Sequence, residues 1–244
     1  MRRSLALALT LAVLALAVLA GPVFAQGLSI DFGSDTSLAT RSIEIMLLIT
    51  VLSIVPGLAV MVTCFPFIVT VLSILRQALG LQQSPPNMVI VSLALFLTWF
   101  VMDPVFTEAW AKGVQPLTDG TITVQQAIPL VTAPFRAFMT ARTNPETFAA
   151  LQALRPGSTG AAISAPLSLL VPSFMLSEIS RAFEIGFLIF LPFLIIDLVT
   201  AAILMSMGMM MVPPAVVSLP FKLAFFVVAD GWTLISGALV RSYS

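Results

Sequence analysis

The chain has 244 residues, of which 59% are hydrophobic and 9% charged, and its mean hydropathy is +1.09. These values exclude an ordinary soluble domain and indicate a membrane protein. The sequence contains no histidine, one cysteine and no glycine-rich phosphate-binding motif, so imidazole chemistry, an intrachain disulfide and the common nucleotide sites are excluded. Eleven basic residues balance eleven acidic ones, without a basic run after residue 3. We therefore expect no metal, no cofactor and no nucleic-acid partner.

The N-terminus has the three parts of a secretory signal peptide. Arg2 and Arg3 precede an apolar stretch over residues 5–19, and a helix-breaking pair and a small residue follow. We expect cleavage between Ala25 and Gln26, with an uncleaved anchor helix as the alternative. Residues 26–42 then form a flexible mature N-terminus on the outer side of the membrane.

Residues 43–104 are predicted to form a first helical hairpin. Its first helix is interrupted at Pro56 and at Pro66, which should kink or split it. After a polar turn, the second helix starts at Met88. It is expected to stop at Asp103, because the residue before a proline is disfavoured in the helical conformation.

Hydropathy falls over residues 105–166, which we expect to form a small polar, periplasmic helical domain. Thr143 to Glu146 predict a helix start, with a proline and an acid in its first turn. Four of the nine basic residues of the mature chain lie in this region: Lys112, Arg136, Arg142 and Arg155.

Residues 167–244 are predicted to form a second hairpin, kinked at Pro192. From Ile185 to Met211 its first helix is apolar apart from Asp197, and the return limb carries Lys222 and Asp230 in apolar surroundings. An unpaired charge in mid-membrane costs about 2.5 to 3.5 kcal/mol, so we expect these charges to be buried and compensated. Lys222 is the nearest basic partner for Asp197, and a partner chain is the alternative.

A methionine run lies between the two limbs of this hairpin, before a Pro-Pro turn. Consecutive side chains cannot all face one core. Because methionine is unbranched and mobile, the run is interpreted as a pliable pore or contact lining, with gap-filling core packing as the alternative. Its residues are Met205, Met207, Gly208, Met209, Met210 and Met211.

The loops left on the inner side of the membrane contain only Arg76 and Lys222 as basic residues. This is a poor match to the excess of inner positive charge found in ordinary membrane proteins. We infer that the hairpins are buried largely against other protein chains.

Motifs along nearly the whole mature chain resemble the FliP family, the export-gate subunit of the bacterial flagellar type III secretion apparatus. The residues that carry the resemblance are 75–80, 84–87, 93–98, 136–139, 177–178, 182–183, 185–187, 191–197, 207–211, 219–222 and 230–232. Two positions depart from the family pattern. Phe67 replaces a usual arginine, and Ser180-Arg181 replaces a lysine-led pair, so the ion pairs at these positions are not expected to follow the family.

The resemblance implies a multi-pass protein of the bacterial inner membrane, within the flagellar basal body, that is not an enzyme. It implies a homo-oligomer, a pentameric ring, assembled with FliQ and FliR family proteins and near FlhA and FlhB family proteins. Unfolded rod, hook and filament subunits would pass through this ring, with the methionine run at its narrowest point. Two alternatives stay open: the gate subunit of a virulence injectisome, and a small ion or solute transporter that uses Asp197, Lys222 and Asp230.

Overall fold

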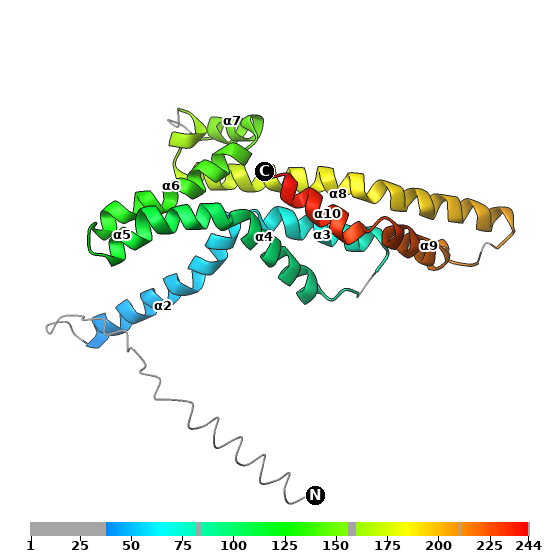
Figure 1. The fold of residues 1–244 in the computed structure, drawn as a ribbon, viewed down its shortest axis with the longest axis horizontal. Helices are drawn as coiled ribbons and strands as arrows, with labels where there is room; N and C mark the ends of the chain where they lie inside the picture. Colours follow the sequence, from blue (N-terminus) through cyan, green and yellow to red (C-terminus); the bar gives the residue numbers. More distant parts are fainter. Residues whose placement is uncertain (1–37, 82–83, 156–159, 210, 244) are drawn as a thin grey trace, which may run out of the picture. The chain divides into compact units, whose positions relative to one another are not determined.

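The computed structural model describes residues 38–81, 84–155, 160–209 and 211–243, and no strand occurs among them (Figure 1). The expected all-α fold class is confirmed. Helical stretches Asn87–Thr118 and Leu167–Ser206 are each long and apolar enough to cross a membrane. Two further pairs of helices meet the same criterion when each pair is counted as one bent span. The expected cleavage site at Ala25 and Gln26 lies outside the described residues.

Contacts divide the chain into two units, residues 1–51 and 52–244. Helix α2 (Leu38–Met61) begins in the first unit and continues through Pro56 without a break. Helix α3 (Phe65–Ala78) follows after three non-helical residues, with Pro66 in its first turn, where the missing amide hydrogen is tolerated. The helix is therefore split at Pro66, as predicted, and not at Pro56.

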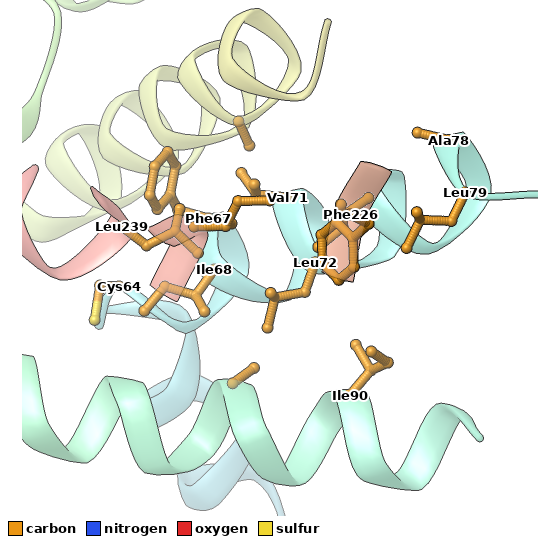
Figure 2. Close-up of a cluster of buried hydrophobic side chains, with 14 of the residues drawn as sticks. Cys64, Phe67, Ile68, Val71, Leu72, Ala78, Leu79, Ile90, Phe226 and Leu239 are labelled. Carbon is orange, nitrogen blue, oxygen red and sulfur yellow. The ribbon is translucent and has the colours of Figure 1, made fainter. Parts of the chain in front are cut away.

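Helix α3 lies at the centre of the main hydrophobic core of the second unit. Its buried residues recur with helical spacing and include Phe67, Val71 and Leu75. Figure 2 shows this face meeting Ile90 of α4 on one side, with Phe226 of α9 and other C-terminal residues completing the cluster. The core thus joins helices that are far apart in the sequence.

Helix α4 (Asn87–Ala109) passes through Pro104, so the expectation that it stops at Asp103 is wrong. The preference of the residue before a proline for a non-helical backbone is overridden here by packing, since Met102 and Ala109 on either side of the proline are both buried. The helix continues into a π-helical turn, η1 (Trp110–Val114), and into α5 (Gln115–Thr118).

Two helices and one 3-10 turn follow α5 and complete the connection between the two predicted hairpins. Helix α6 (Val124–Arg142) starts with a capping box, and α7 (Pro145–Ala153) starts where it was predicted. The side chain of Asn144 accepts hydrogen bonds from the amides of Glu146 (2.8 Å) and Thr147 (3.3 Å), which fixes the start of α7. A single 3-10 turn, η2 (Ala162–Ser164), then leads into α8.

Helix α8 (Leu167–Ser206) has 40 residues and is therefore roughly 60 Å long. It runs through Pro192 without a break. The return limb of the predicted second hairpin is divided into α9 (Pro214–Val228) and α10 (Gly231–Arg241), with a bend of 62°. Asp230 adopts a left-handed conformation at the bend (φ 47°), which aspartate tolerates better than most residues.

Candidate functional site

A polar node connects three helices in the second unit. We call it the Lys222 node: Lys222 and Ser218 on α9, Asp197 on α8 and the backbone carbonyl of Ala78 at the end of α3. Lys222 Nζ lies 2.6 Å from Asp197 Oδ2 and donates a second hydrogen bond, of 3.0 Å, to the Ala78 carbonyl. The Ser218 hydroxyl donates to Asp197 Oδ1 at 2.6 Å. The expected pairing of Asp197 with Lys222 is therefore present within one chain.

The Lys222 node also supplies a hydrogen bond that α3 cannot make for itself. The last carbonyls of a helix have no amide partner within that helix. Lys222, with a side chain that is only 6% exposed, reaches one of them while it neutralises Asp197. The pair is thus well suited to hold α3, α8 and α9 together.

Asp230 takes no part in this node. It lies in the exposed turn between α9 and α10, and its side chain does not cap the helix that follows it. The structure therefore brings together two of the three charges singled out in the sequence. Burial of Asp230 by a neighbouring chain stays a prediction.

The methionine run lies at the end of α8 and in the loop that follows. Gly208 has a left-handed backbone (φ 76°), and the helix ends there in a Schellman motif. The amide of Gly208 donates to the Met205 carbonyl (3.1 Å), and that of Met209 donates to the Leu204 carbonyl (2.9 Å). The glycine thus turns the chain out of the helix.

The methionines that the structure describes are exposed in the isolated chain. The exposed fractions are 60% for Met205, 66% for Met207, 42% for Met209 and 97% for Met211, whereas Met210 lies outside the described residues. Gap-filling core packing within one chain is therefore not the role of these four side chains.

A second group of charges, which the sequence did not identify as a site, surrounds Glu178 of α8. We call it the Glu178 cluster: Glu178, Arg142, Arg181 and Tyr243. The Glu178 side chain is fully buried, and its Oε1 accepts from Arg142 Nε of α6 and from Arg181 Nη1, each at 3.1 Å. Tyr243 donates to the other oxygen. The available signal was the neighbouring pair Glu178 and Arg181, because the other two partners of Glu178 lie 36 and 65 residues away.

Both departures from the family pattern are next to this cluster. Arg181 pairs with Glu178 one helical turn away, so the shifted positive charge still has a carboxylate partner. Phe67 is fully buried, with its ring centre 5.5 Å from that of Tyr243 and 5.9 Å from the Arg142 guanidinium. The aromatic ring of Phe67, which replaces the usual arginine, therefore lies beside the Arg142 guanidinium.

The described residues contain no group of three or more cysteine, aspartate or glutamate side chains arranged to hold a metal ion. The charged side chains of the Lys222 node and of the Glu178 cluster form ion pairs within the chain.

Comparison with known proteins identifies the family. A sequence model of the FliP family matches residues 48–239. The chain belongs to the FliP family. Among curated members, a flagellar biosynthetic protein FliP of Agrobacterium fabrum is 49% identical, over 86% of this chain and 87% of the relative. The FliP of Caulobacter vibrioides is 45% identical, over 99% and 91%. That of Bacillus subtilis is 42% identical, over 88% and 98%.

The FliP family match covers the Lys222 node, the methionine run and all of the Glu178 cluster except Tyr243. The Lys222 node lies entirely within residues 48–239, as do the methionine run and Glu178. Tyr243 follows the matched region, so the contact between Tyr243 and Glu178 joins the family region to the C-terminal end of this chain.

Proposed function

We propose that this chain is a pore-forming subunit of the flagellar protein export gate, in the bacterial inner membrane. As a FliP family member it is a component of the flagellar export apparatus. In the proposal, copies of the chain form a pentameric ring with FliQ and FliR family proteins, near FlhA and FlhB family proteins. Unfolded rod, hook and filament subunits pass through this ring.

The exposed apolar surface of the second unit is the observation that carries the proposal. Large rings on α4 and α8 are more than half exposed: Phe96, Trp99, Phe100, Phe183 and Phe187. A surface of this kind must be covered by lipid or by other protein chains. It supports a subunit that completes its packing in an assembly.

The methionine run supports the position of the pore constriction. A closed channel for unfolded chains must exclude ions when idle and adapt to side chains of many shapes. Exposed methionines on a glycine-terminated helix end meet both demands, because the thioether side chain repacks easily. Ring symmetry would bring several copies of this end together.

The Lys222 node argues against the transporter alternative. A transport pathway needs an ionisable group that is accessible to its ion or substrate. Here Lys222 is buried, and Asp197 is occupied by both Lys222 and Ser218. The node therefore fits a structural role between helices better than a carrier role.

Native mass spectrometry of the complex extracted in mild detergent with its neighbours tests the proposal. We expect several copies of this chain together with FliQ and FliR family proteins, and little conductance from this chain alone. A monomer that transports ions by itself would contradict the gate and favour the transporter.

A further inference from the structure

The C-terminal residues of the chain are inserted among helices that come much earlier in the sequence. Tyr243 follows α10 and lies against the main core. Its ring meets Phe67 of α3 edge-on and stacks on Phe138 of α6, with ring centres 5.5 Å and 5.9 Å apart. The Arg142 guanidinium lies 4.0 Å from the centre of the same ring, a distance typical of a cation–π contact.

Glu178 and Arg142 bind the polar atoms of this C-terminal segment. The Tyr243 hydroxyl donates to the fully buried carboxylate of Glu178. Arg142 Nη1 donates to the backbone carbonyl of Ser242 at 2.7 Å. Burial, reinforced by the Glu178 charge, raises the pKa of Tyr243, so the phenol keeps its proton at neutral pH and acts as the donor.

We propose that Tyr243 is a C-terminal latch, which fastens α10 to α3, α6 and α8 through Glu178 and Arg142. Without the latch, Glu178 loses its only contact from the C-terminal segment among the residues described, and α10 is held by its connection to α9 and by the packing of Ile235 and Leu239 in the main core. The Lys222 node, which lies on α9, stays intact. The latch therefore affects how firmly α10 is held in place, while α8 and α9 stay joined by the Lys222 node.

Cys64 is a natural reporter of this latch. It is the only cysteine of the chain, it is fully buried, and it belongs to the core cluster that Phe67 and Leu239 share and that Tyr243 packs against. Figure 2 shows Cys64 at the end of this cluster, close to Leu239 of α10. Release of α10 would uncover the side of the core that contains the thiol.

The test measures alkylation of Cys64 by a maleimide, together with hydrogen exchange, in the full-length protein in detergent. We expect Tyr243→Ala to raise the alkylation rate about tenfold or more and to speed exchange in residues 231–243. Tyr243→Phe keeps the ring and loses the hydroxyl, so we expect a smaller rise, of roughly fivefold. Arg241→Ala is the control, because Arg241 is exposed on the same helix; it should leave Cys64 protected.

Three results would overturn the latch. Cys64 could stay as protected in Tyr243→Ala as in the parent protein. Tyr243→Phe could match the parent while only Tyr243→Ala reacts, which would show packing without a role for Glu178. Exchange could rise equally in every helix of Tyr243→Phe, which would show general destabilisation and not release of α10.

Discussion

Lys222 and Asp197 are exposed to different degrees, and this difference decides what substitution of each residue does. The Lys222 side chain is 6% exposed and that of Asp197 is 32% exposed. Removing one partner of a buried ion pair leaves the other charge without compensation, and the penalty falls as that charge gains contact with water. The lysine is therefore the charge that depends more on its partner.

Asp197→Asn should lower stability by roughly 2 to 3 kcal/mol, because it leaves the Lys222 ammonium buried beside neutral groups. Lys222→Met should be milder, at about 1 to 2 kcal/mol, because Asp197 keeps Ser218 and some water. The double variant should recover part of the loss. Thermal unfolding of the parent and the three variants, all purified in detergent, gives the coupling free energy between the two residues. If Asp197→Asn assembles normally but abolishes export, the aspartate acts in transport and not as a structural partner.

The contact between α3 and α8 depends on a glycine on the longer helix. A Cβ atom at Gly186 would lie 2.4 Å from Ile74 Cδ1 and 3.0 Å from its Cγ2. The first distance is shorter than carbon atoms approach and the second is tighter than most real contacts, so any larger residue here would displace the Ile74 side chain or the helix. The α3 core cluster depends on this close approach.

Gly186→Ala should destabilise the protein by about 1 to 3 kcal/mol, because the added methyl group pushes α3 away or forces Ile74 from its rotamer. Ile74→Ala in the same chain should relieve part of the clash. Gly57→Ala is the matched control, since nothing lies within 4 Å of a Cβ there, and it should be neutral or slightly stabilising. The melting temperature is measured for the parent protein and the three variants. Equal shifts for Gly186→Ala and Gly57→Ala would contradict the close contact.

At the scale of the whole molecule, two exposed apolar surfaces must be covered by lipid or by other protein chains. Apolar rings remain exposed along α4 and α8, and the methionine run is exposed at the far end of α8. Neither is explained by packing within the described residues. Both are expected of a subunit whose remaining contacts are made in a ring.

Replacing Met209, Met210 and Met211 together by alanine should leave the complex assembled and make the membrane leak small ions. Alanine removes the mobile side chains that would close the constriction, while Gly208 still ends the helix. Efflux of potassium from cells, compared with the amount of assembled complex, measures the effect. Met88→Ala is the control, because Met88 is also largely exposed (76%) but lies on α4. An assembled triple variant as tight as the parent would rule out a methionine constriction.

The sequence by itself determined the features that depend on neighbouring residues. Mean hydropathy indicated the membrane class, the proline and acid near Asn144 marked the start of α7, and the scarcity of charges left Lys222 as the evident partner of Asp197. The methionine run and its glycine marked the end of α8. Capping and turn chemistry act within one or two helical turns, so they are visible in a local stretch of sequence.

Only the tertiary structure decided the passage of α4 through Pro104, the bend at Asp230 and the Glu178 cluster. Met102 and Ala109 hold α4 in place by packing against other helices, which no local rule contains. Phe226 lies so close to Gly231 that a Cβ atom there would be 2.2 Å from its ring. Arg142 and Tyr243 are 101 positions apart and meet at one buried carboxylate. The passage of α4 through Pro104 and the Glu178 cluster are set by contacts between residues distant in the sequence, whose energies exceed the local preferences that the sequence displays.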